Sequence, residues 1–204
     1  EILLASPAVV AAAESYIGLV EVGVGVIPSG GGLAELAERV LTAPDQKSNK
    51  INKMADVVTR IAMGHVAMSA YEAKRDLILR DTDTIIANGD HRIAVALEKA
   101  DFIDRTNYVP RTELTFEALG EDFTAIVEGQ LDSMRLGNFI SDYDMELGLA
   151  VADTLAGGKV PKRTYVNQQW IQHLEKEQFV RLAKNQKTYE RIAHMLEKKK
   201  PLRN

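Results

Sequence analysis

The stretch GLVEVGVGVIPSGGGLAEL, residues 18–36, decides the fold that we expect for this chain. Its first half, residues 19–27, has the density of β-branched side chains that is typical of a short buried strand. The proline and glycine cluster at residues 28–32 then predicts a turn, after which apolar residues recur at helical spacing. The stretch therefore predicts a strand, a glycine turn and a helix. Its first half carries one acidic residue, Glu21, among small and apolar neighbours.

A strand that feeds a glycine turn into a helix presents free backbone N–H groups and the positive end of a helix dipole. Both stabilise an anion or a developing oxyanion. The glycines do not match the phosphate-binding P-loop, because no Lys-Ser or Lys-Thr pair follows them. They also lack the spacing of the dinucleotide fingerprint. The plain alternative is a tight turn that lets the helix pack on the strand.

Composition limits the function classes. With 204 residues, 46% of them hydrophobic, the chain can bury the core of one domain with a helical appendage. No apolar run approaches the ~18 residues that span a bilayer, and the opening residues lack the basic flank of a signal peptide. The absence of cysteine excludes disulfides and thiolate sites and fits the cytoplasmic location that we expect. Because the sequence begins with Glu rather than Met, we expect a piece of a longer polypeptide.

The net charge of −4 is unevenly distributed. Residues 162–204 contain 11 basic and 4 acidic side chains, whereas the residues before them contain 14 basic and 25 acidic ones. Such a basic segment can meet phosphates, an acidic neighbouring surface or solvent alone. We expect neither nucleic-acid binding nor membrane insertion.

The rest of the chain is predicted to be mostly helical. Residues 8–13 predict a second short strand, residues 42–53 a polar loop, residues 77–87 a strand pair or a turn, and residues 104–117 a linker. Helices are expected over residues 54–76, 90–103, 119–137, 140–158 with a Gly-Gly stop, 166–183, and from Thr188 as N-cap onward.

The stretch around Glu21 resembles the second signature of the crotonase superfamily, the enoyl-CoA hydratases and isomerases. Members read roughly Pro-Glu, then alternating hydrophobic residues and a glycine, then Pro-Gly-x-Gly-Gly, and Glu21 occupies the place of the Glu. Three positions depart from this pattern: Val20 stands for Pro, Ser29 for Gly, and Leu33 for Thr or Cys.

Two further segments are similar to family segments. They are AYEAKRDLILRDTDTII at residues 70–86, where Asp76 replaces a glycine, and ERIAHMLEKKKPLRN at residues 190–204. The long helical second half and the KPLRN ending resemble the C-terminal crotonase module of a fused β-oxidation protein. Such a protein carries a 3-hydroxyacyl-CoA dehydrogenase in front of the module.

The resemblance implies two catalytic carboxylates. In the family's hydratases the second one lies twenty residues upstream of the signature Glu, a position that Glu1 occupies here. Glu1 would then activate water and Glu21 would protonate the α-carbon of a trans-2-enoyl thioester, although the two roles can be exchanged or shared. Paired buried acids suit this chemistry because they can hold different protonation states. The family's oxyanion donors precede Glu1, so the resemblance implies that the 204-residue chain alone is inactive or nearly so.

The resemblance also implies substrate contacts. Gly30, Gly31 and Gly32 are expected to bind substrate through the turn. Lys198, in the family's Glu-Lys-Arg position, is expected to reach a CoA phosphate, with a solvated basic terminus as the alternative. The four histidines lack the spacing of metal ligands, so no metal site is expected.

We therefore predict an α+β, predominantly helical fold, the C-terminal part of a crotonase-like spiral with a few short strands at the N-terminus. Residues 1–105 would be the remnant of the spiral core and residues 106–204 a helical region whose helices contact other copies in a homo-oligomer. Coenzyme A would enter only as part of the acyl-CoA substrate, and NAD only in the dehydrogenase part outside this chain. A crotonase-fold isomerase or hydrolase and a non-catalytic scaffold are the alternatives.

Overall fold

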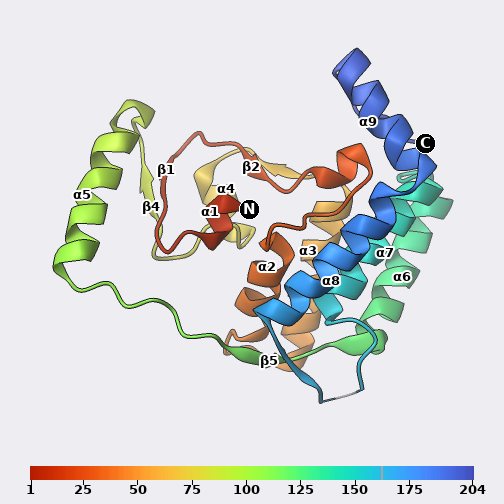
Figure 1. The fold of residues 1–204 in the computed structure, drawn as a ribbon, viewed down its shortest axis with the longest axis horizontal. Coiled ribbons are helices and arrows are strands. Elements are labelled where there is room, and N and C mark those ends of the chain that lie inside the picture. Colours follow the sequence, from red (N-terminus) through yellow and green to blue (C-terminus); the bar gives the residue numbers. More distant parts are fainter. Residues whose placement is uncertain (162) are drawn as a thin grey trace. The chain divides into compact units, whose positions relative to one another are not determined.

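The computed structural model of the chain describes residues 1–161 and 163–204 (Figure 1). These residues form two compact units, each assembled from separate parts of the sequence. The first unit contains Glu1, Leu19–His65 and Leu114–Asn204, and the second contains Ile2–Gly18 and Val66–Glu113. The division expected at residue 105 separates the remnant of the spiral core from the helical region. The two compact units do not test it, so it stays a prediction.

Helix α7 (Asp142–Ala156) is the centre of the first unit. It contacts α2 (Gly32–Leu41), α3 (Lys47–Ala62), α6 (Gly120–Leu136) and α8 (Gln168–Ala183) (Figure 1). A helix with neighbours on several sides must be apolar on several faces, and Leu147, Val151 and Leu155 of α7 are all fully buried. A capping box begins α7, and Gly157 in the left-handed conformation ends it, which confirms the predicted glycine stop.

The first unit also contains short elements. The 3-10 helix η1 (Glu21–Val24) precedes the glycine turn, and α9 (Gln186–Lys198) contacts η1. Strands β5 (Thr115–Glu117) and β6 (Tyr165–Asn167) pair antiparallel.

The second unit is built from short strands and helices. Its elements are α1 (Ile2–Ala5), β1 (Val10–Ala12), β2 (Ile17–Gly18), β3 (Val66–Ala67), α4 (Ala70–Arg75), β4 (Thr84–Ile86), η2 (Gly89–His91) and α5 (Arg92–Arg105). β1 pairs parallel with β4, and β2 pairs antiparallel with β3. Small apolar side chains fill its core, among them Ala11, Ala67 and Ala73. The buried carboxylate of Asp83 accepts a hydrogen bond from the N–H of Val9 at 3.0 Å, which ties the two segments of this unit together.

The predicted class, α+β and predominantly helical with a few short strands, is confirmed. Strand β1 and helices α2, α5, α6, α7 and α8 form where the sequence predicts them. Among the described residues, no helix combines the length and the apolar character that crossing a bilayer requires.

The strand predicted over residues 19–27 is wrong. Residues Glu21–Val24 form a 3-10 helix instead, which ends at Gly25 with a φ of 86°. Val22 and Ile27 are fully buried by packing rather than by strand pairing. A high density of β-branched residues can indicate burial as well as a β-strand, and in this segment it indicates burial only.

Three other boundaries differ from the predictions. The polar loop expected at residues 42–53 is wrong from Lys47 onward, because α3 begins there with its polar first turn in solvent. The helix expected over residues 54–76 is broken at Gly64, whose φ of 63° ends α3, and α4 starts afresh after its N-cap Ser69. The last helix begins at Gln186 with Asn185 as N-cap, so Thr188 is not the cap.

We predict that Leu147→Ala lowers the free energy of unfolding by about 2–5 kcal/mol, because it leaves a cavity where α7 meets its neighbours. The matched control is Leu136→Ala on α6, whose side chain is 68% exposed and whose loss should cost less than about 0.5 kcal/mol. Urea denaturation followed by circular dichroism measures both. Equal losses in the two variants would contradict the central place of α7.

Candidate active site

The glycine turn at the start of α2 holds two carboxylates of the chain itself. The N–H groups of Gly30 and Gly32 donate to Oε1 of Glu1 at 2.6 and 3.0 Å. The N–H groups of Gly31 and Ala34 donate to the two carboxylate oxygens of Glu175 at 2.9 and 2.8 Å. The first N–H groups of a helix have no partner within the helix and carry its positive dipole end, so two negative side chains are well placed here.

The turn requires glycine for two separate reasons. Gly31 has a φ of 94°, a conformation that residues with a side chain rarely adopt. A Cβ at Gly30 would lie 2.9 Å from Oε2 of Glu1, and a Cβ at Gly32 would lie 3.0 Å from the same side chain. The missing side chains therefore give Glu1 access to the backbone N–H groups.

These contacts bear on the predicted substrate role of Gly30, Gly31 and Gly32. All three N–H groups donate to carboxylates of the chain, so a substrate group that binds there must displace Glu1 or Glu175. The substrate role of the glycines stays a prediction, and their observed role is to fix Glu1 and Glu175.

Glu21 is the first residue of η1 and lines a cavity of about 430 Å³ together with Val20, Gly23, Met195 and Arg203. Its Oε2 is buried and has no hydrogen-bond partner among the described residues. Burial raises the pKa of Glu21, and the negative charge of Glu1 raises it further. The charge of Glu1 thus acts on Glu21, which lies beside a cavity, and the catalytic roles of both carboxyls stay a prediction.

Glu175 is a site residue that the sequence reasoning missed. Its side chain is fully buried. Burial raises the pKa of Glu175 to about 7, and the charge of Glu1 contributes to this rise. The backbone N–H groups that bind its charged form lower the pKa but do not offset the effect of burial. A signal existed in the sequence, because Glu175 shares the helical spacing of Ile171 and Leu182, the buried residues of α8.

Lys198 is the last residue of α9, and its side chain is exposed. It lies on the helix that contacts η1, and its expected role toward a CoA phosphate stays a prediction.

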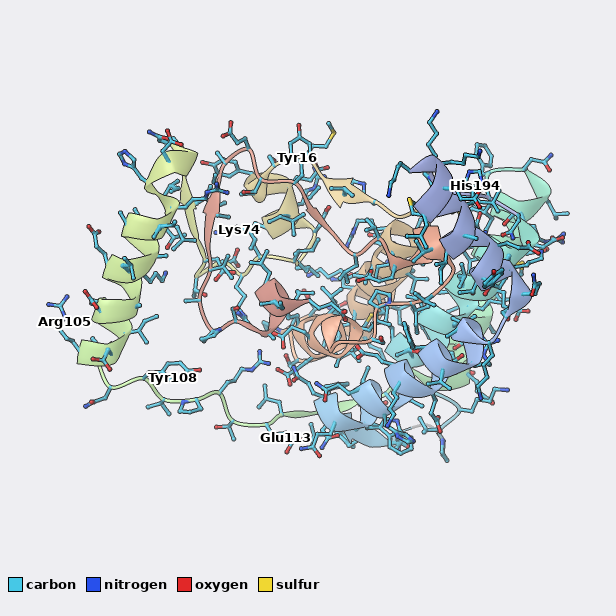
Figure 2. The ribbon with its side chains drawn as sticks, turned by 45° about the horizontal axis from the view of Figure 1, so that its top comes forward. Tyr16, Lys74, Arg105, Tyr108, Glu113 and His194 are labelled. Atoms are coloured by element: carbon cyan, nitrogen blue, oxygen red, sulfur yellow. The ribbon has the colours of Figure 1, made fainter. Side chains whose placement is uncertain are left out.

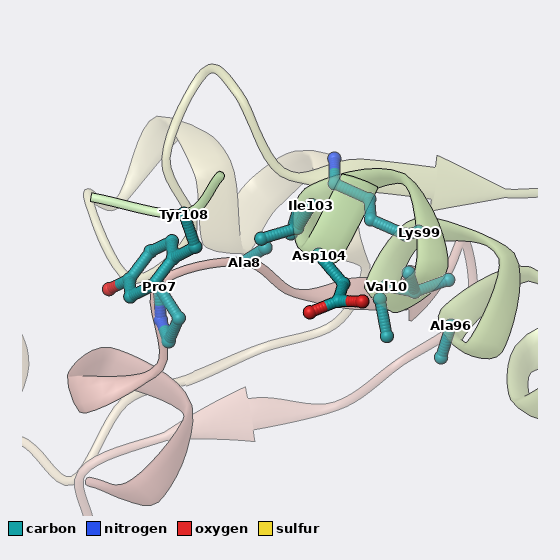
Figure 3. A pocket seen from close by; sticks show the side chains of 9 residues that line it. Pro7, Ala8, Val10, Ala96, Lys99, Ile103, Asp104 and Tyr108 are labelled. Atoms are coloured by element: carbon teal, nitrogen blue, oxygen red, sulfur yellow. The ribbon is translucent and has the colours of Figure 1, made fainter. Parts of the chain in front are cut away.

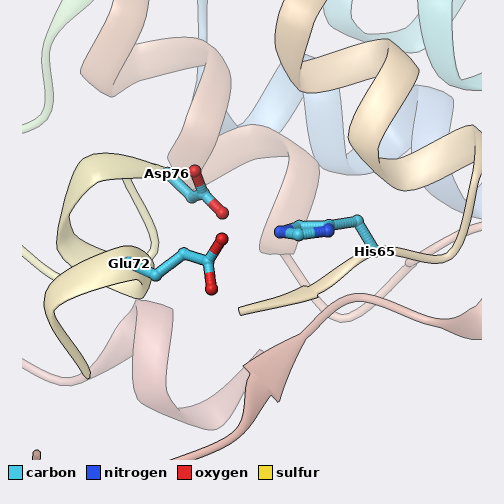
Figure 4. A group of neighbouring side chains, drawn as sticks. All are labelled: His65, Glu72 and Asp76. Atoms are coloured by element: carbon cyan, nitrogen blue, oxygen red, sulfur yellow. The ribbon is translucent and has the colours of Figure 1, made fainter. Parts of the chain in front are cut away.

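The histidines lie in separate parts of the chain; His194, for example, lies on α9 (Figure 2). Figure 4 draws two carboxylates of the second unit, Glu72 and Asp76, together with His65 of the first unit. The Glu72 carboxylate accepts from the N–H of Met68 at 2.7 Å and from Arg75 at 2.8 Å, so it stabilises the start of α4. The absence of a metal site stays a prediction.

The second unit has a cavity of its own, of about 370 Å³, between β1 and α5 (Figure 3). Its lining is largely apolar and includes Val10, Ile103 and Tyr108. None of the predicted site residues lines it.

Comparison with known proteins gives a clear relative. Over all 204 residues the chain is 37% identical to the "Probable 3-hydroxyacyl-CoA dehydrogenase" of Bacillus subtilis (strain 168). The expected resemblance to such a protein is confirmed. The match falls in the C-terminal part of that relative, and the chain spans only 26% of its length. No family model matches the chain.

Among solved structures, the chain is similar to a carnitinyl-CoA hydratase from Mycobacterium avium. The TM-score is 0.49 and the sequence identity 18%, and the match covers 98% of this chain and 56% of the hydratase.

The raised pKa of Glu175 predicts how stability depends on pH. The unfolded chain ionises Glu175 near its ordinary pKa of 4.5, whereas the folded chain keeps the proton until about 7. The free energy of unfolding should therefore fall as the pH rises between these values, by at most about 3 kcal/mol from this group. We expect Glu175→Gln to flatten this dependence between about pH 5 and pH 8 in urea denaturation.

The matched control is Glu177→Gln, which removes an exposed carboxylate from the same helix. In this variant the free energy of unfolding should depend on pH as steeply as it does in the wild type. A Glu175→Gln variant with the wild-type slope would show that this carboxyl titrates normally.

Proposed function

We propose that the chain supplies the catalytic carboxyl pair of an enoyl-CoA hydratase module within a longer fatty-acid β-oxidation protein. The observation that carries the proposal is that the glycine turn fixes Glu1 while Glu21, whose pKa the charge of Glu1 raises, lines a cavity. The family resemblance supplies the reaction, and the name of the bacterial relative supports acyl-CoA thioesters as the substrate class.

In the proposed reaction, Glu1 takes a proton from water while the water oxygen bonds to the β-carbon of a trans-2-enoyl thioester. Glu21 gives its proton to the α-carbon, so that one carboxyl gains a proton and the other loses one. The raised pKa of Glu21 supports this assignment, because an acid must still hold its proton when substrate binds. Glu1 accepts two backbone N–H bonds, which hold its carboxyl in place.

The product of this reaction, a 3-hydroxyacyl thioester, is the substrate of a 3-hydroxyacyl-CoA dehydrogenase. We propose that such a domain, with its NAD, lies in the same protein but outside these residues, in line with the greater length of the relative. The chain alone would then have little activity, because the oxyanion donors of the family also lie outside it. A cytoplasmic location belongs to the same proposal.

The second candidate function is assembly. Tyr189, Ile192 and Leu196 form an apolar stripe on α9 that is 41–67% exposed. We propose that this stripe contacts other copies of the protein, which is compatible with the hydratase and would be the main function of a non-catalytic scaffold.

We predict that Glu21→Gln and Glu1→Gln each lower the rate of crotonyl-CoA hydration about 100-fold or more in the longer protein, because each removes one proton-transfer group. The exposed Glu14 offers a matched control, and Glu14→Gln should keep the rate within about two-fold. Loss of the ultraviolet absorbance of the conjugated thioester measures the rate. Full activity in both Glu variants would end the hydratase proposal and leave assembly as the better one.

We predict that Lys198→Gln raises the KM for crotonyl-CoA about three-fold or more at an unchanged kcat, and that it weakens the dependence of KM on salt. The control is Lys200→Gln, which removes a second exposed cation nearby. Identical KM values in the wild type and in Lys198→Gln would show that Lys198 does not contact the CoA phosphate and is only solvated.

A further inference from the structure

Side chains from α7 and α9 bind a carbonyl group of the short helix η1 and the carbonyl group of its C-cap, Gly25. The hydroxyl of Thr188 donates to the carbonyl oxygen of Gly25 at 2.6 Å, and the hydroxyl of Tyr143 lies 2.5 Å from that of Thr188. Nη1 of Arg191 donates to the carbonyl oxygen of Val22 at 3.0 Å. Both carbonyls lie within four residues of Glu21, so η1 is bound at two points close to the carboxyl that it carries.

These groups are buried and their charge is compensated. Thr188 and Arg191 are completely buried, and Tyr143 is 1% exposed. The guanidinium of Arg191 contacts the carboxylate of Asp144 at 2.9 Å and lies over the ring of Tyr143. Burial alone would raise the pKa of Asp144, but the N–H of Ser141 and the guanidiniums of Arg191 and Arg203 lower it, so the charged form of Asp144 is favoured. A buried charged pair keeps a fixed geometry, because a shift of either partner leaves the other uncompensated.

The packing at the end of η1 is equally tight. Gly25 has a φ of 86°, and a Cβ built on it would lie 2.8 Å from Oγ1 and 2.9 Å from Cα of Thr188. The backbone of α9 therefore touches the backbone of the turn at Thr188.

A 3-10 helix of four residues has few internal hydrogen bonds and poor hydrogen-bond geometry, so it does not fix its own position. η1 depends on its surroundings for that. The carboxyl oxygen Oε2 of Glu21 also has no hydrogen-bond partner among the described residues, so no hydrogen bond fixes this atom.

We propose that Thr188 and Arg191 are positioning residues that hold η1, and through it the carboxyl of Glu21, at its place beside the cavity. The catalytic part of this inference rests on the proposed hydratase function, whereas the effect on Glu21 itself does not. Both residues act through the backbone of Val22 and Gly25 and do not contact the reacting atoms.

The test uses a pair of substitutions at one site and a matched control. Thr188→Val removes the hydroxyl at nearly constant volume, and Thr188→Ser keeps it. Thr154→Val removes another fully buried hydroxyl of the same unit, which donates to the carbonyl of Ala150 at 2.8 Å within α7. Thr154→Val therefore removes a fully buried hydroxyl of this unit without touching η1.

Two readouts separate positioning from stability. In the longer protein we expect Thr188→Val to lower kcat for crotonyl-CoA about ten-fold or more with KM within about two-fold, Thr188→Ser to restore kcat, and Thr154→Val to leave it unchanged. In the 204-residue chain, carbon-13 NMR of labelled glutamate measures the pKa of Glu21. It should fall toward the ordinary value in Thr188→Val, because a loosened turn exposes the carboxyl to water.

The outcomes distinguish the two proposals. An inactive wild-type protein would remove the hydratase function, and the NMR titration would still decide whether Thr188 fixes Glu21. An unchanged pKa of Glu21 in Thr188→Val, or an equal loss of kcat in Thr188→Val and Thr154→Val, would overturn the positioning role.

Discussion

The hydrogen bonds from the first N–H groups of α2 to two glutamates are the interaction on which the rest of the site depends. They join three distant parts of the sequence, because Glu1, the glycine turn and Glu175 of α8 meet at one helix end. Positive backbone charge gathers there and offsets the cost of placing two carboxyls close together. Without these donors, Glu1 and Glu175 would repel each other in a poorly solvated place. The turn is thus an anion site whose occupants are side chains of the chain.

Glu21 and Glu175 respond to the same charge in different surroundings. The negative charge of Glu1 raises the pKa of both. Glu175 is enclosed and bound on both oxygens, whereas Glu21 has a buried oxygen without a hydrogen-bond partner among the described residues and lines a cavity. Of the two, Glu21 is therefore the carboxyl with an oxygen that no described residue binds.

The sequence predicts the parts of this site that depend on local signals. The glycine cluster, helix α2 and the Gly157 stop can be read from neighbouring residues, whereas the role expected of Glu21 follows only from the family resemblance. η1 could not be predicted, because its β-branched residues are buried by helices that lie far away in the sequence. The same holds for Glu175, whose partners lie more than 140 residues before it. Helix α3 was predicted to start too late because its first turn is polar, and only the course of the backbone shows that this turn is helical.

The hydrogen bonds between α9 and the η1 segment affect the order in which the site forms while the protein is synthesised. The hydrogen bond from Thr188 to Gly25 spans 163 residues, and that from Arg191 to Val22 spans 169. Contacts between such remote partners form late, since the intervening chain must first be made and closed into a loop. A ribosome that has translated η1 through α8 therefore carries a nascent chain in which these two hydrogen bonds have not yet formed. On the proposed positioning role, the carboxyl of Glu21 reaches its place only after α9 has left the exit tunnel.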